Sequence, residues 1–105
     1  MAMIEDFIRY QAQTTPHPMG LTVDRAHGSY IYDTQGRKYL DFVAGVSACS
    51  VGHCHPEVVE AIQKQAQEYL HVMVYGEFAQ GPAVTLCKLL AEYLPKNLTT
   101  TYLVN

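Results

Sequence analysis

The sequence lacks the features that mark membrane, secreted and nucleic-acid-binding proteins. No apolar run approaches the roughly 20 residues of a membrane-spanning helix. The first ten residues carry acidic side chains inside their apolar pattern, unlike the apolar stretch of a secretion signal. The seven lysines and arginines are scattered singly and the net charge is -3, so no basic patch is available for nucleic acid. We therefore expect a soluble, cytoplasmic protein with no membrane or nucleic-acid partner.

Cysteine is also scarce. The chain has three cysteines, Cys49, Cys54 and Cys87. An odd count at irregular spacing does not form a disulfide framework, and reduced thiols are the simpler interpretation. Hydrophobic residues make up 49% of the 105 residues, so a core can be buried, although a chain of this length forms one domain at most.

The first half of the chain predicts a helix followed by an antiparallel sheet. Apolar residues recur at helical spacing within residues 3–12, and the prolines of the stretch TTPHPMG then end that amphipathic helix. Three short strands follow, in LTVDRA, SYIYD and RKYLDF. Gly28 and Gly36 lie where tight turns need a positive φ, and Asp33 can cap its own turn. The sequence therefore predicts a three-stranded antiparallel meander.

Two further helices are expected in the second half. Pro56 suits the first position of a helix, and apolar residues follow at helical spacing to about Leu70. A second helix is expected from Pro82 to about Leu94, after a loop with exposed aromatic residues. Residues 101–104 are β-branched and aromatic like a buried strand. Because no closing element follows that strand, we expect the chain to be a piece of a longer protein.

Residues 43–52, VAGVSACSVG, fit neither the helical nor the strand period. They are small, mostly apolar and uncharged. Such residues suit a backbone that runs close to another chain segment, a partner subunit or a ligand. A tight loop packed under the core is the alternative, and the sequence alone favours neither.

The stretch GHCHP, residues 52–56, allows three interpretations. A zinc site needs four converging ligands, usually from two separated pairs, and a second pair at ligand spacing is missing. A catalytic thiol at Cys54 is disfavoured because side chains adjacent in sequence diverge, so a small buried hydrophobe is the simpler interpretation of Cys54. The remaining interpretation is an elbow before a helix, in which the side chain of His53 or His55 bonds the free N–H groups of the helix start. We therefore expect no metal site.

A longer pattern surrounds this stretch. It comprises Gly28, Asp33, Gly36, Tyr39, Leu40, Asp41, Phe42, Gly52, His53, His55 and Pro56. The pattern closely resembles the N-terminal segment of the class III aminotransferases, the pyridoxal-phosphate enzymes of fold type I that include acetylornithine, ornithine and 4-aminobutyrate aminotransferases. The resemblance implies an α/β parent protein. The 105 residues would form an α+β part of that parent, with an N-terminal helix, the antiparallel meander, two further helices and the start of a large-domain strand.

The resemblance also implies a division of the chain and of the chemistry. Residues 1–55 would belong to the small domain, with its meander and pocket loop, and residues 56–105 would lead into a large cofactor domain. The phosphate-binding turn, the pyridine-nitrogen aspartate and the Schiff-base lysine of the family lie further along the sequence. No catalytic or cofactor-binding residue is therefore expected in this chain. Its four lysines, Lys38, Lys64, Lys88 and Lys96, have no claim to the Schiff-base role.

Substrate contacts are expected from a few positions. By the resemblance, Gly45, Val46 and Ser47 would line the substrate side of the pocket. The position of Val46 is a tyrosine in ornithine δ-aminotransferases, which favours acetylornithine-like or ω-amino-acid substrates here. Tyr75 and Phe78 match a region near the pocket entrance and the dimer interface.

The parent protein would thus be a homodimeric enzyme that uses pyridoxal phosphate to transfer an amino group from an amino acid or ω-amine to a 2-oxo acid. A mutase, decarboxylase or racemase on the same fold is a related possibility. The 105-residue chain itself is expected to be inactive and to bind no pyridoxal phosphate. The alternative from a different class is a non-catalytic α+β binding or dimerisation module.

Overall fold

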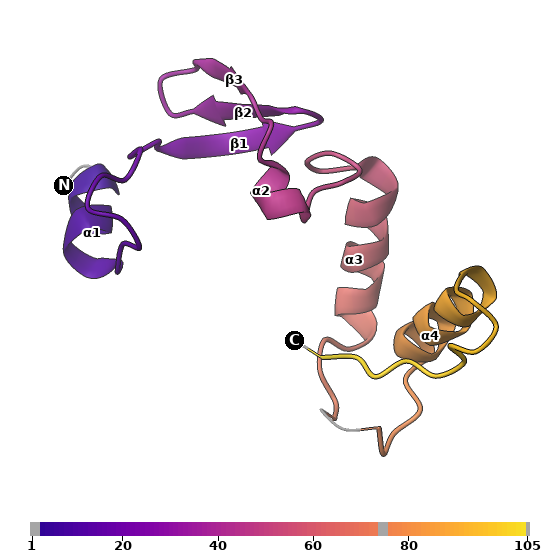
Figure 1. The fold of residues 1–105 in the computed structure, drawn as a ribbon. Coiled ribbons are helices and arrows are strands. Elements are labelled where there is room, and N and C mark those ends of the chain that lie inside the picture. The colour runs from indigo at the N-terminus through magenta and orange to yellow at the C-terminus, as the bar shows by residue number, and fades with distance from the viewer. Residues whose placement is uncertain (1–2, 74–75, 105) are drawn as a thin grey trace. The chain divides into compact units, whose positions relative to one another are not determined.

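The computed structural model describes residues 3–73 and 76–104. Its elements follow the chain as α1 (Met3–Tyr10), β1 (Val23–His27), β2 (Tyr30–Asp33), β3 (Lys38–Leu40), α2 (Ala44–Ser47), α3 (Pro56–Glu68) and α4 (Gly81–Tyr93) (Figure 1). The chain divides into two compact units, Met1–Gln67 and Glu68–Asn105. The α+β character and the predicted order of a helix, a meander and two longer helices are confirmed.

The three strands form one antiparallel sheet in the order β1-β2-β3. Tyr30 of β2 lies between His27 of β1 and Leu40 of β3. The turns that join the strands contain Gly28 at φ 56° and Gly36 at φ 80°, backbone angles that favour glycine. The predicted meander and both of its glycine turns are therefore confirmed.

The two long helices begin and end close to the predicted residues. In α3 the first backbone hydrogen bond runs from the N–H of Val59 to the carbonyl of His55 at 3.0 Å, and Pro56 takes the first helical position, as expected. The helix ends at Glu68, two residues before the predicted end. Within the described residues, none of the helices is long and apolar enough to cross a membrane.

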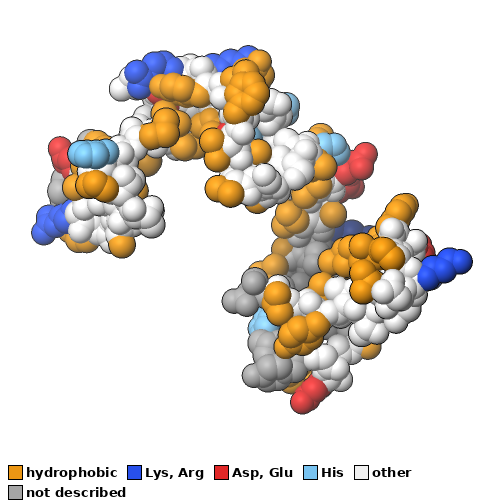
Figure 2. Space-filling view, in the orientation of Figure 1, with side chains coloured by type: hydrophobic (Ala, Val, Ile, Leu, Met, Phe, Trp, Pro, Cys, Tyr) orange, Lys and Arg blue, Asp and Glu red, His pale blue; other side chains and the backbone are white. Residues whose placement is uncertain are grey.

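The expected hydrophobic core is not formed by the described residues. None of their hydrophobic side chains is buried, and Figure 2 shows hydrophobic side chains on the surface of each unit. Residues 99–104 form no strand, and Tyr102 is 81% exposed. The prediction of a strand at residues 101–104 is therefore wrong for the described residues. A strand needs a pairing partner, and no described segment pairs with this one.

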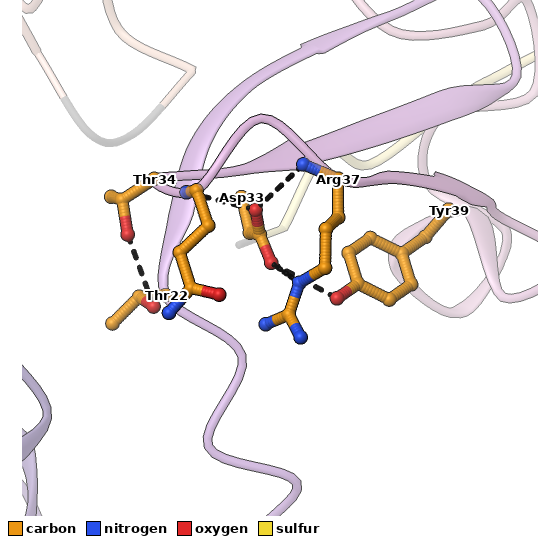
Figure 3. Close-up of polar contacts among 6 residues, drawn as sticks. Thr22, Asp33, Thr34, Arg37 and Tyr39 are labelled. Carbon is orange, nitrogen blue, oxygen red and sulfur yellow. Dashed lines mark hydrogen bonds and ion pairs between the residues drawn. The ribbon is translucent and has the colours of Figure 1, made fainter.

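A buried carboxylate organises the turn between β2 and β3 (Figure 3). Asp33 is 1% exposed. Its Oδ1 accepts hydrogen bonds from the backbone N–H groups of Gln35 and Arg37, both at 2.9 Å. Its Oδ2 accepts from Arg37 Nε at 2.6 Å and from the Tyr39 hydroxyl at 2.9 Å. The prediction that Asp33 caps its own turn is confirmed.

Hydrogen bonding also fixes the charge of this aspartate. Burial alone would raise the pKa of Asp33, but the bonds from Arg37, Tyr39 and the backbone N–H groups outweigh it and lower that pKa from 3.8 to about 2. Burial and the bond to Asp33 raise the pKa of Tyr39. The carboxylate is thus ionised at neutral pH, where it fixes the β2–β3 turn.

Candidate functional site

A small pocket lies where the end of the meander meets the GHCHP elbow. Its volume is about 190 Å³. The residues that line it are Gly28, Ser29, Asp41, Ala44, Cys49, Ser50, Gly52 and His53. The pocket therefore combines the first hairpin turn, the residue after β3, the small-residue stretch 43–52 and the elbow.

Two backbone hydrogen bonds connect the elbow to the first hairpin. Gly28 N–H donates to the His53 carbonyl at 2.9 Å, and His53 N–H donates to the Gly28 carbonyl at 2.8 Å. Gly52 packs closely against the backbone of Gly28 and has a φ of 90°. A Cβ built on Gly52 would lie 3.3 Å from Gly28 Cα and from the Gly28 carbonyl oxygen. Only glycine fits this close approach without displacing backbone.

Asp41 is the polar centre of the pocket. Its side chain is 6% exposed, and its Oδ2 lies 2.6 Å from Nε2 of His53, which is 18% exposed. Its Oδ1 accepts from the backbone N–H groups of Val43 at 2.9 Å and Ala44 at 3.0 Å. We call this set, Asp41 with the His53 ring and the N–H groups of Val43 and Ala44, the Asp41 clasp.

The clasp holds an ionised carboxylate. The hydrogen bond from His53, together with those from the Ala44 and Val43 N–H groups, lowers the pKa of Asp41, and burial opposes that shift only in part. An ionised carboxylate only accepts hydrogen bonds, so the Nε2 that faces it carries the proton. The imidazole of His53 is thereby fixed in one tautomer when neutral.

The expected role of the histidines at the start of α3 is wrong. The His53 side chain bonds Asp41 instead of the free N–H groups of the helix. Nδ1 of His55 is buried and has no hydrogen-bond partner among the described residues. Backbone geometry explains the difference, because the bridge to Gly28 directs His53 towards the meander. Cys54 is likewise not a buried hydrophobe, since its thiol is exposed and its φ is 52°.

The small-residue stretch contains a left-handed turn. The φ angles are 50° at Ala44, 60° at Gly45, 58° at Val46 and 67° at Ser47. A left-handed backbone costs about 1–2 kcal/mol for each residue other than glycine, and a β-branched residue such as valine seldom adopts it. Val46 is also 87% exposed, so this stretch is not a loop packed under a core. Strain of this kind is often found at functional sites.

The residues predicted to contact substrate lie in or near this turn. Gly45, Val46 and Ser47 form α2 together with Ala44, and of the four only Ala44 lines the 190 Å³ pocket. Phe78 belongs to the second unit, where it is 53% exposed and lines a wider groove of about 640 Å³ with α4 and residues 101–103. Tyr75 lies outside the described residues.

The contact between Asp41 and His53 was not expected from the sequence. The sequence places both residues in the family pattern and predicts His53 as a possible partner of the helix start, but it does not pair the two residues with each other. Strand alternation places Asp41 on the other face of the strand from Leu40 and Phe42, and this signal could have indicated that Asp41 faces the pocket. No local feature of the sequence indicates that its partner is His53, 12 residues away.

Comparison with known proteins gives consistent results. The family model for class-III aminotransferases matches residues 10–105. The chain is 48% identical over 65 residues to acetylornithine aminotransferase of Methanocaldococcus jannaschii, covering 62% of the chain and 16% of that protein. It is 36% identical over 96 residues to isoleucine 2-epimerase of Lentilactobacillus buchneri, covering 90% of the chain and 21% of that protein.

A solved structure shows the same similarity. The crystal structure of adenosylmethionine-8-amino-7-oxononanoate aminotransferase from Methanocaldococcus jannaschii superposes with a TM-score of 0.80 at 30% identity, covering 92% of the chain and 23% of that structure. The chain thus spans less than a quarter of the length of each of these relatives. Since the family match extends over nearly all of its residues, the chain belongs to the class-III aminotransferase family.

Proposed function

We propose that this chain supplies the substrate side of a pyridoxal-phosphate-dependent aminotransferase. The enzyme would transfer an amino group from an acetylornithine-like amino acid or an ω-amino acid to a 2-oxo acid. The family match over residues 10–105 supports the reaction class, and the acetylornithine aminotransferases among the relatives support the substrate class. The structural observation that carries the proposal is the strained turn α2, held by the Asp41 clasp and exposing Val46.

The proposed division of labour follows the resemblance. Gly45, Val46 and Ser47 would face the substrate, and Tyr75 and Phe78 would lie near the pocket entrance or the interface of a homodimer. Val46 has no hydroxyl to bind a distant amine, so the proposal disfavours ornithine as a δ-amine donor. Residues 1–55 would belong to the small domain and residues 56–105 would lead into the large domain of a cytoplasmic enzyme.

The 190 Å³ pocket does not fit the cofactor by itself. Pyridoxal phosphate needs a lysine for its aldehyde and N–H groups or cations for its phosphate. The 190 Å³ pocket is lined by neither lysine nor arginine, and its one ionised side chain, Asp41, would repel a phosphate. The ammonium of Lys38 lies 3.7 Å from the centre of the Tyr30 ring, outside the pocket lining. In the proposed enzyme this chain therefore shapes the substrate cavity, and other residues hold the cofactor.

The test is an amino-transfer assay on the protein as expressed from its gene. With pyridoxal phosphate added, N-acetylornithine and 2-oxoglutarate should yield glutamate, and ornithine should be the poorer donor. Inversion at the α-carbon of an amino acid without amino transfer, the kind of reaction named for the epimerase relative, would contradict the transaminase proposal. No reaction with any amino donor would favour the non-catalytic binding or dimerisation module.

A further inference from the structure

The left-handed turn α2 needs an external constraint. Three of its four residues are not glycine, and each pays about 1–2 kcal/mol for its backbone conformation. Within the turn, Ser47 N–H donates to the Val43 carbonyl at 3.1 Å and Cys49 N–H donates to the Ala44 carbonyl at 2.9 Å. These bonds stabilise the turn, but they do not determine where it lies relative to the sheet.

Asp41 determines that position. Its Oδ1 accepts the N–H groups of both Val43 and Ala44, the two residues that begin the turn. Its own N–H donates to the Ser29 carbonyl at 2.9 Å, which fixes Asp41 to the meander just after β3. The carboxylate therefore connects the start of the turn to the sheet directly.

His53 holds the carboxylate in the orientation that makes this connection. Its Nε2 lies 2.6 Å from Oδ2, the oxygen that does not bind the turn. The two backbone bonds to Gly28, at 2.8 and 2.9 Å, fix the His53 backbone in turn. Without the ring, Oδ2 would lose its partner and the carboxylate could rotate away from the N–H groups of the turn.

The geometry points to Asp41 and His53 as positioning residues for the substrate-facing turn. They act through the turn, because they set where Gly45, Val46 and Ser47 lie. This inference rests on the proposed function, because it assigns the turn to the substrate side of an aminotransferase. Since the proposed function assigns the cofactor to other residues, loss of the clasp should weaken substrate binding more than it slows the chemical step.

The experiment uses the protein as expressed from its gene, with four variants. His53→Ala removes the donor, and His53→Gln restores an N–H near the position of Nε2. The amide of His53→Asn is one methylene too short to reach Oδ2. The control is His17→Ala, at an exposed residue of the segment between α1 and β1.

Steady-state kinetics give the first readout. His53→Ala and His53→Asn should raise KM for the amino donor about tenfold or more while kcat changes less than about threefold, the pattern of lost substrate binding. His53→Gln should stay within about threefold of the unmodified protein in both constants, and His17→Ala should match it. Unchanged KM in His53→Ala, or equal impairment in His53→Gln and His53→Asn, would overturn the inference. If His53→Ala does not fold, the comparison of His53→Gln with His53→Asn decides.

Amide hydrogen exchange gives a second readout that needs no activity. Peptides covering residues 42–48 should exchange about tenfold faster in His53→Asn than in His53→Gln, because the N–H groups of Val43 and Ala44 lose their acceptor. Peptides covering residues 33–38, protected by Asp33, should be unchanged. Equal exchange of residues 42–48 in both variants would overturn the inference that His53 holds Asp41 against the turn. If the unmodified protein transfers no amino group while this exchange difference is found, the proposed function fails and the clasp stands.

Discussion

Replacing Gly52 with alanine should separate the elbow from the meander. Gly52 has φ 90°, where a residue with a Cβ is strained by about 1–2 kcal/mol. The new Cβ would also lie 3.3 Å from Gly28 Cα and from the Gly28 carbonyl oxygen, and backbone atoms cannot move aside as a flexible side chain would. Overpacking of this kind costs about 1–3 kcal/mol more. Local stability at the bridge between Gly28 and His53 should therefore fall by about 2–5 kcal/mol, the sum of the two effects.

Gly28→Ala is the matched control. Gly28 also has a positive φ, 56°, but a Cβ built on it meets no atom within 4 Å, so only the backbone strain of about 1–2 kcal/mol applies. Amide hydrogen exchange at His53, whose N–H donates across the bridge at 2.8 Å, measures both losses. If the His53 amide exchanges no faster in Gly52→Ala than in Gly28→Ala, the steric part of the reasoning is refuted.

Three further predictions concern charge, thiol access and specificity. The pKa of Asp33 is lowered from 3.8 to about 2, so the contribution of this carboxylate to folding stability is complete above about pH 4 and is lost as the pH falls through about 2. NMR of the Asp33 carboxyl should show a titration midpoint of about 2, and a midpoint near 4 would contradict the prediction. Cys54 is exposed while Cys49 and Cys87 are half-buried, so Ellman's reagent should react with Cys54 first, and Cys54→Ser should abolish the fast phase. In the proposed enzyme, Val46→Tyr should raise kcat/KM for ornithine about tenfold, the effect of one hydrogen bond to a charged amine; an unchanged ratio of ornithine to N-acetylornithine activity would count against the assigned position.

The meander and the long helices were predictable because their signals are local. Gly28 and Gly36 adopt the positive φ that hairpin turns need, and the residues between them include Tyr30, Ile31 and Tyr32, the aromatic and β-branched types that strands favour. Pro56 begins α3 because a proline at the first helical position loses no hydrogen bond. Each of these features depends on residues within a few positions of one another.

The Asp41 clasp and the left-handed turn were not predictable in the same way. Asp41 meets His53 across 12 residues, and the contact exists because the backbone bridge to Gly28 folds the elbow against the meander. The stretch 43–52 has too little side-chain pattern to indicate a left-handed turn, and it contains only one residue, Gly45, that favours this conformation before the turn ends. The strand expected at residues 101–104 failed for a related reason, because β-branched composition does not supply a pairing partner.

The most direct test of the account is an absorbance spectrum with added pyridoxal phosphate. It should be recorded for the 105-residue chain and for the protein as expressed from its gene. The account predicts the band of cofactor bound to a lysine in the protein from the gene and only free cofactor with the 105-residue chain, because the proposed function assigns to this chain only the substrate side of the cavity. The band appearing with the 105-residue chain alone, or absent from the protein expressed from the gene, would contradict it.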